Sequence, residues 1–197
     1  MKRSGFKQKL TVPLKRSPFK HKVPLKGQKQ GKVKSKKVKV KKTARAKKTA
    51  LRRQIIEQYQ LPDLLCSRYG MGKNPTRQDI LKGLLWRVFS RFIRARDKYC
   101  ISCLLEKILQ AGHYAPAGGN DLELLFSEFN VNGECEGCNG FDSFHLVPMR
   151  KNLIAKYGIE KVEELDLQKS QKKAIKWEET VYVEKIKYYY NELQKCR

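Results

Sequence analysis

The clearest pattern in the chain is a helical repeat of apolar positions between residues 76 and 98. Apolar side chains recur there every three or four residues, which places them along one face of an α-helix. Thr76, followed three residues later by Asp79, has the spacing of a capping box at a helix N-terminus. We therefore predict an amphipathic helix from Thr76 to about Lys98, with Trp86 at the edge of an apolar face formed by Ile80, Leu81, Leu84, Leu85, Val88, Phe89, Phe92 and Ile93.

Weaker patterns predict helices on both sides of this segment. Residues 50–60 favour a short helix that ends before Pro62, because proline cannot continue a helix. Pro148 and Gly158 have the residue types that begin and end a further helix, and residues 160–165 favour another short helical turn. Ser170 is then expected to cap a long C-terminal helix with an apolar and aromatic face formed by Ile175, Tyr182, Ile186, Tyr189 and Leu193.

The middle of the chain has a different character. Residues 111–115 are expected to form a short strand, followed by a turn that contains Gly118 and Gly119. Residues 122–131 favour a second extended segment, and a helix is expected after Cys138. The predicted order is therefore strand, strand and helix within a mainly helical chain.

The positive charge of the chain is concentrated at its N-terminus. The net charge is +25, and residues 1–53 hold 22 of the 44 Lys and Arg, with no acidic residue before Glu57. The rest of the chain thus carries only +3. Residues 1–50 contain too few apolar side chains to offset the entropy of ordering them, so we predict a disordered basic arm.

Two functions are open for this arm. It is either a targeting, solubilising or membrane-surface segment, or an electrostatic anchor for nucleic acid. Residues 32–42 contain valines but no aromatic anchors, which disfavours a membrane helix and favours DNA or RNA. The chain has no apolar run of membrane-spanning length and no signal peptide, so a cytoplasmic protein without a membrane partner is expected. Arg87, Arg91 and Arg94 share one helix face, which is either solvated or in contact with phosphates.

The cysteines predict a metal site. Four of the six form two C-x-x-C pairs, Cys100 with Cys103 and Cys135 with Cys138, which are separated by 31 residues. In a reducing compartment this pattern is typical of a four-cysteine structural zinc site, whose metal contributes folding free energy. A redox motif is the weaker alternative, because it leaves the second pair unexplained. Cys66 and Cys196 have no partner at such spacing and are expected to be ordinary thiols.

His113 is the strongest candidate for a reactive side chain. It is one of three histidines and lies on the first predicted strand, between the cysteine pairs. Four cysteines fill a tetrahedral zinc shell, so the imidazole of His113 is not needed as a zinc ligand. Two roles remain for His113: a buried structural side chain, or a general base that takes a proton from an attacking water. Residues suited to Mg²⁺ follow the second pair closely: Asn139, Asp142 and His145.

These motifs, taken in order, resemble one protein family. Residues 92–165, about two-fifths of the chain, resemble the phage NinG (Rap) recombination nucleases, a branch of the HNH or His-Me finger endonucleases. The resemblance rests on the runs Phe92–Asp97, Cys100–Cys103, Ala111–Tyr114, Leu125–Asn130, Cys135–Asn139, Leu146–Arg150 and Leu153–Gly158. Several short motifs with compatible gaps are far more specific than any one of them.

The resemblance implies a fold and a set of roles. The fold would be α+β, with a small zinc-stapled ββα-metal core flanked by α-helices and preceded by the basic arm. Together with the charge pattern and the predicted helices, this divides the chain into the arm at 1–50, a helical region at 51–98, the nuclease core at 99–158 and a C-terminal helical region at 159–197. His113 would be the general base, Asn130 would brace the loop that orients it, and Asn139 would bind the catalytic Mg²⁺ or Mn²⁺.

The implied function is that of a structure-specific endonuclease. Such a protein would cut branched DNA, such as Holliday junctions or D-loops, in a prophage-carrying or phage-infected bacterium, in association with the nucleoid. The sequence departs from the wider HNH pattern at Gly112, where many of these enzymes place a metal-ligating Asp or His. The second metal ligand is thus left open between Asp142, His145 and Glu128.

Further departures leave an alternative function open. Residues 140–145 differ from the run typical of the phage proteins, and an N-terminal cysteine-rich finger is absent. A non-catalytic zinc module that binds DNA or RNA remains the alternative. The tyrosine-rich C-terminal helix would pack either on its own domain or on a second copy in a homodimer.

Overall fold

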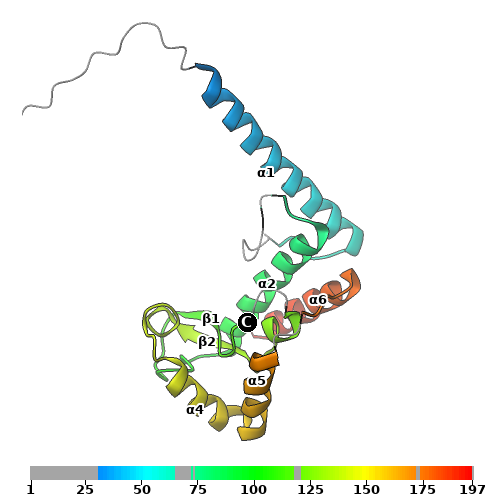
Figure 1. Ribbon diagram of the computed structural model, residues 1–197. Coiled ribbons are helices and arrows are strands. Elements are labelled where there is room, and N and C mark those ends of the chain that lie inside the picture. The colour runs from blue at the N-terminus through cyan, green and yellow to red at the C-terminus, as the bar shows by residue number, and fades with distance from the viewer. Residues whose placement is uncertain (1–30, 65–71, 73, 118–120, 172–173, 197) are drawn as a thin grey trace, which may run out of the picture. The chain divides into compact units, whose positions relative to one another are not determined.

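The computed structural model describes residues 31–64, 72, 74–117, 121–171 and 174–196, and the side chains among them from Arg45 onward. In order, its elements are α1 (Gly31–Tyr59), α2 (Arg77–Arg96), β1 (Leu109–His113), α3 (Leu122–Leu125), β2 (Val131–Cys135), η1 (Gly137–Phe141), α4 (Leu146–Tyr157), α5 (Ile159–Gln171) and α6 (Glu179–Lys195) (Figure 1). The chain divides into two units, residues 1–38 and 39–197, and the second contains the sheet and all the paired cysteines.

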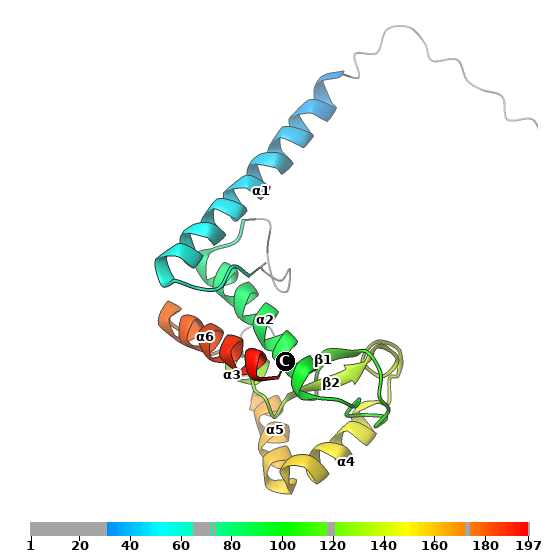
Figure 2. The same cartoon turned by 180° about the vertical axis from the view of Figure 1, so that it is seen from behind.

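Helix α2 forms the centre of the main hydrophobic core. Its predicted capping box is confirmed, with the Thr76 side chain accepting a hydrogen bond from the Asp79 backbone and the Asp79 side chain accepting one from the Thr76 backbone. All eight residues of the predicted apolar face are buried. Helix α6 lies alongside α2 in both views, and the Phe89 and Tyr189 rings pack with their centroids 4.8 Å apart (Figures 1 and 2). The C-terminal helix therefore packs on its own chain, through the predicted residues Tyr182, Ile186, Tyr189 and Leu193.

The two strands form a short antiparallel sheet against α2. Leu109 pairs with Cys135, and His113 pairs with Val131. Asp97, the C-cap of α2, accepts a hydrogen bond of 2.8 Å from the Gly133 backbone and pairs with Arg96 and Lys156. Burial alone would raise the pKa of Asp97, but the guanidinium, the amide and the ammonium group together lower it. This charged anchor fixes β2 to the end of α2.

Helices α4 and α5 cover a second, smaller core. It contains the buried residues Ile101, Tyr114, Ala115, Leu124, Met149, Leu153, Val162 and Leu165. Helix α4 ends at Gly158, as predicted, and this glycine has a φ of 89°, a conformation that L-residues rarely adopt. The helix begins two residues before Pro148, which is tolerated because first-turn N–H groups have no partner within the helix. The short turn predicted at 160–165 is part of the longer α5.

Two of the predicted elements are wrong. Residues 122–131 are not extended: they begin with α3, which Asp121 caps by accepting a hydrogen bond from the Leu124 backbone, and the strand starts only at Val131. A short apolar run does not distinguish a buried helix from a buried strand. Ser170 does not cap the last helix but lies inside α5, where its hydroxyl donates to the Leu167 carbonyl. The first strand is offset from the prediction by two residues.

The basic arm also differs from the prediction. Residues 31–50, expected to be disordered, belong to α1, and the end of this helix at Tyr59 agrees with the stop expected before Pro62. Lysine and alanine are good helix formers, and residues 31–50 contain nine lysines and three alanines. Residues 1–30, which include His21, lie outside the described residues, and so does Cys66.

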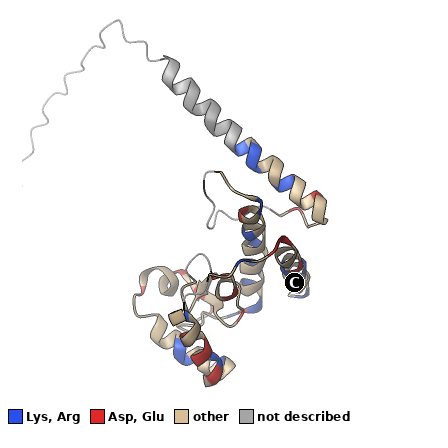
Figure 3. Cartoon of the chain, turned by 45° about the vertical axis from the view of Figure 1, so that its right-hand side comes forward, with Lys and Arg blue, Asp and Glu red and all other residues tan. Residues whose placement is uncertain are grey.

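The described part of the second unit has a mixed surface charge. Figure 3 shows basic and acidic residues interspersed along its helices, in agreement with the net charge of +3 after residue 53. None of the helices within the described residues is long and apolar enough to cross a membrane.

Candidate active site and metal centre

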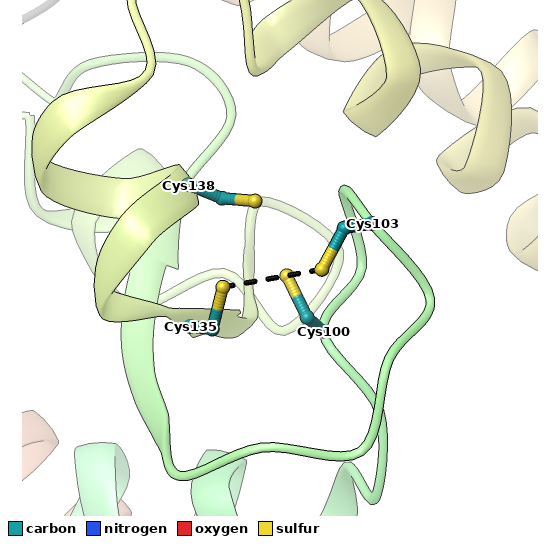
Figure 4. A group of neighbouring side chains, drawn as sticks. All are labelled: Cys100, Cys103, Cys135 and Cys138. Atoms are coloured by element: carbon teal, nitrogen blue, oxygen red, sulfur yellow. Dashed lines mark hydrogen bonds between the residues drawn. The ribbon is translucent and has the colours of Figure 1, made fainter.

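Four cysteines converge at one end of the sheet. Cys100 and Cys103 lie in the turn before β1, Cys135 ends β2, and Cys138 lies in η1. Their sulfurs point toward one another and all lie within 4.8 Å of each other (Figure 4). The Sγ atoms of Cys103 and Cys135 are 3.9 Å apart, close to the spacing of about 3.8 Å that Zn–S bonds of about 2.3 Å give in a tetrahedron. The predicted association of the four cysteines is confirmed, and the cluster could hold a metal such as zinc.

The electrostatics of the cluster suit a bound cation. The Cys138 backbone N–H lowers the pKa of the Cys135 thiol to about 7. Burial raises the pKa of the Cys100 thiol and of the Cys138 thiol. At Cys138 the neighbouring sulfurs raise the pKa further. The Cys135 thiol is thus easily ionised, whereas ionisation of Cys100 and Cys138 is opposed by burial and by the neighbouring sulfurs. A divalent cation at the centre would compensate four thiolates at once.

His113 is held in one tautomer at the end of β1. Its ring stacks on Trp86 of α2, with centroids 5.4 Å apart and planes 7° from parallel. Its Nε2 lies 3.2 Å from the Leu125 carbonyl oxygen, which can only accept, so Nε2 carries the hydrogen and Nδ1 has a free lone pair. Burial lowers the pKa of His113 despite the opposing effect of this carbonyl. The imidazole is therefore neutral near pH 7.

Asn130 lies fully buried between the end of β1 and α3. Its side chain accepts from the Ala115 amide at 2.7 Å and donates to the Ala115 and Leu124 carbonyls, each at 2.9 Å. Leu124 directly precedes Leu125, whose carbonyl orients His113. Asn130 thus ties Ala115, just after β1, to α3, whose last residue provides this carbonyl.

A buried acid that the sequence analysis missed faces Gly112. Glu134 on β2 is fully buried. Its Oε1 accepts a hydrogen bond of 2.6 Å from the Ser102 hydroxyl and lies 2.8 Å from His145 Nδ1. The only signal in the sequence was an acidic residue beside Cys135, and sheet register alone decides whether such a residue points inward.

Asn139 comes close to the same point. A Cβ added to Gly112 would lie 2.2 Å from Glu134 Oε2 and 3.0 Å from Asn139 Oδ1. The Asn139 side chain is exposed and donates a hydrogen bond of 2.8 Å to Gln110 Oε1. The missing side chain at residue 112 therefore leaves room for two oxygen atoms.

The other candidate metal ligands lie in different surroundings. His145 is in contact with Glu134 through its Nδ1. Asp142 is exposed, and its carboxylate accepts from the Phe144 backbone in its own turn. Glu128 pairs with Arg96 at 3.6 Å and lines a separate hollow that contains Phe129. Of the predicted ligands, His145 therefore contacts the Glu134 carboxylate directly, and Asn139 lies beside the same carboxylate at Gly112.

The arginines of α2 line surface hollows. Arg87 and Arg94 share a hollow of about 290 Å³ with Asn139, and the other lining residues are Trp86, Ser90, Gln110 and Ala111. Arg91 and Arg94 border a second hollow of about 650 Å³, together with Lys98 and Lys107. The first hollow connects the arginine face, the ring that stacks on His113, and an oxygen donor.

Comparison with known proteins gives one consistent result. The model of the family described as "Bacteriophage Lambda NinG protein" matches residues 9–197. Proteins named "Protein ninG" from Escherichia phage lambda and Salmonella phage P22 are each 40% identical over 79 residues, which cover 38% of this chain and 38% of each relative. The "Protein ninG" of Escherichia phage 933W is also 40% identical over 79 residues, 39% of its length. No solved structure matches the chain significantly.

Proposed function

Since the chain belongs to the NinG family, we propose that it is a metal-dependent HNH-type endonuclease that cuts branched DNA during recombination in a phage-infected or prophage-carrying bacterium. The observation that carries this proposal is the neutral His113, held by the Leu125 carbonyl and stacked on Trp86. Trp86 also lines the hollow that contains Asn139 and two arginines. An oxygen donor and two cationic groups thus line one surface hollow, together with the tryptophan ring on which His113 stacks.

These residues suit phosphodiester hydrolysis. Nδ1 of His113 would accept a proton from the water that attacks phosphorus, a contribution of about 10²–10⁴ to the rate. Arg87 and Arg94 would hold the phosphate oxygens through charge-assisted hydrogen bonds. Asn139 would hold Mg²⁺ or Mn²⁺, which when bound supplies Lewis-acid stabilisation of the charge on phosphorus and on the leaving oxygen. Zinc at the four cysteines would stabilise the fold.

A non-catalytic function is the alternative. The four-cysteine cluster and the basic N-terminal segment would be enough for a zinc module that only binds DNA or RNA. Such a module has no use for a neutral histidine whose tautomer is fixed by a backbone carbonyl. We therefore favour the nuclease.

A cleavage assay distinguishes the two functions. The zinc-loaded full chain is incubated with a Holliday junction, a flap, single-stranded DNA and linear duplex, with Mg²⁺ or Mn²⁺. We expect cleavage of the branched substrates that stops on adding EDTA and returns when excess Mg²⁺ is supplied. Tight binding to all four substrates without cleavage under any condition would favour the non-catalytic module.

Deleting residues 1–38 is expected to weaken DNA binding and to make the binding constant less dependent on salt concentration. These residues hold 14 Lys and Arg and no acidic residue. Each phosphate that the protein no longer neutralises lowers the slope of log K against log salt by about 0.9 for duplex DNA. Fluorescence anisotropy over a series of salt concentrations measures this slope. The deletion keeps Ile55 and the rest of the buried end of α1, so the melting temperature should not change.

A full-length variant provides the matched control. Replacing the same 14 Lys and Arg with glutamine keeps the chain length and should reproduce the flatter slope. If both variants kept the parent's slope, the N-terminal segment would not be the phosphate anchor.

A further inference from the structure

The carboxylate of Glu134 is buried with one oxygen unsatisfied. A charged group out of contact with water is costly unless it is paired and hydrogen-bonded. Oε1 meets this need through Ser102 and His145. Oε2 does not: of the buried side-chain oxygens and nitrogens within the described residues, it is the one without a hydrogen-bond partner. An oxygen of this kind is expected to have a partner that is not part of the protein.

The direction of Oε2 indicates where that partner lies. The oxygen points to the space beside Gly112, where a Cβ atom would lie only 2.2 Å away. Any larger residue at position 112 would displace the Glu134 side chain. Asn139 Oδ1 lies 3.0 Å from the same point. Two oxygen atoms, from β2 and from η1, therefore converge beside one glycine of β1.

Each of these two oxygens is oriented by hydrogen bonds to the other polar atom of its own side chain, which is Oε1 in Glu134 and Nδ2 in Asn139. Ser102 and His145 hold Oε1 of Glu134, which leaves Oε2 free. Gln110 accepts a hydrogen bond from Asn139 Nδ2, which turns Oδ1 the other way. Secondary contacts of this type orient the ligands of most protein metal sites. Ser102, His145 and Gln110 are thus positioning residues.

We propose that Glu134 Oε2 and Asn139 Oδ1 bind a divalent cation, and that Glu134 replaces the carboxylate that Gly112 cannot supply. One anionic and one neutral oxygen are hard donors, which suit Mg²⁺ or Mn²⁺ better than the soft sulfurs nearby. The exposure of Asn139 leaves room for water and phosphate oxygens as further ligands. The use of this cation in DNA cleavage rests on the proposed function; its binding does not.

The test measures metal binding directly. The zinc-loaded, ¹⁵N-labelled full chain is titrated with Mn²⁺, and paramagnetic broadening is followed at the Gly112 amide and the Asn139 side-chain amide. We expect Glu134→Gln, which keeps the size of the side chain, to raise the Mn²⁺ midpoint at least tenfold. Glu136→Gln is the matched control, because this neighbouring glutamate is exposed, and it should leave the midpoint unchanged. A parental midpoint in Glu134→Gln would overturn the proposal.

Two further measurements guard against misfolding. Without Mn²⁺, Glu134→Gln should stay folded, because glutamine keeps an acceptor oxygen for the Ser102 hydroxyl, but it should lose the stabilisation that Mn²⁺ gives the parent. Gly112→Ala should also raise the Mn²⁺ midpoint, since its Cβ occupies the space beside Oε2. An unchanged midpoint in Gly112→Ala would likewise contradict the site.

The outcomes also separate this inference from the proposed function. If Glu134→Gln loses Mn²⁺ binding while the parent cuts no DNA substrate, the cation site stands and the nuclease does not. If the parent cuts DNA while Glu134→Gln binds Mn²⁺ normally, the nuclease stands and Glu134 is not a ligand.

Discussion

His113→Ala is expected to lower the rate of metal-dependent DNA cleavage by about 10²–10⁴-fold, the usual contribution of a general base. The Leu125 carbonyl fixes the hydrogen on Nε2, so Nδ1 is the nitrogen available to take a proton from water. Alanine removes that nitrogen without touching the arginines or the cysteine cluster. DNA affinity and zinc content should therefore stay at the parent's values. Single-turnover cleavage of a Holliday junction, with anisotropy and metal analysis on the same samples, makes the comparison.

A second variant controls for the cavity that alanine leaves against Trp86. His113→Gln fills most of this space but provides no base of suitable pKa, so its cleavage should be as slow as that of His113→Ala. Cleavage at the parent's rate by both variants would exclude His113 as the base.

The pH profile of cleavage tests the same residue in the parent protein. Burial lowers the pKa of His113 below the 6.5 of a free imidazole. The neutral, active form therefore persists as the pH falls through 6.5 and is lost only when the pH falls through the lower pKa of the folded state. We expect the acid limb of the pH–rate profile below pH 6.5. An acid limb centred at or above 6.5 would conflict with a buried, neutral His113.

Cys135→Ser is expected to abolish zinc binding and unfold the core. Structural zinc sites contribute about 10–16 kcal/mol of apparent binding free energy, which is comparable with the roughly 5–15 kcal/mol stability of a whole domain. Cys135 is also the end of β2 and pairs with Leu109 of β1, so the loss of the metal would release the sheet. Zinc analysis together with thermal melting by circular dichroism measures both effects.

Cys196→Ser is the matched control for this experiment. Cys196 is an exposed free thiol at the C-cap of α6 and is not one of the four clustered cysteines. Its replacement should change neither the zinc content nor the melting temperature. If Cys135→Ser behaved in the same way, the four cysteines would not hold a structural metal.

The cysteine cluster also supports the proposed cation site. Glu134 directly precedes Cys135, and Asn139 directly follows Cys138. Fixing the two sulfurs of this pair thus fixes the backbone from which both oxygen donors project. Loss of zinc should weaken Mn²⁺ binding even where Glu134 is intact, whereas loss of Glu134 should leave zinc in place.

Local features of the sequence were enough for several elements and one site. Helix α2 was predicted from its apolar repeat and from the Thr76–Asp79 cap, because both signals lie within a few residues of each other. The spacing of two C-x-x-C pairs likewise predicted the cysteine cluster, since each pair presents two sulfurs from one tight turn. The end of α4 at Gly158 followed from the tolerance of glycine for positive φ.

Other features depended on long-range packing. Whether residues 122–125 form a helix was decided by burial of α3 against α2 and by the Asp121 cap. The start of α6 was missed because its N-cap, Glu178, makes no side-chain capping hydrogen bond that a motif could reveal. Neither element has a distinctive local pattern, so tertiary contacts determined both.

The site divides in the same way. By itself, the sequence determined the zinc-type cysteines, the candidate base His113 and the candidate oxygen ligand Asn139, because these residues stand at fixed positions in short motifs. Only the tertiary structure decided that Glu134 faces Gly112. That contact depends on the antiparallel register, in which Gln110 pairs with Glu134, and on Ser102 and His145, which come from two other segments. A one-residue shift in register would turn Glu134 to the opposite face of the sheet, and no local motif encodes that register.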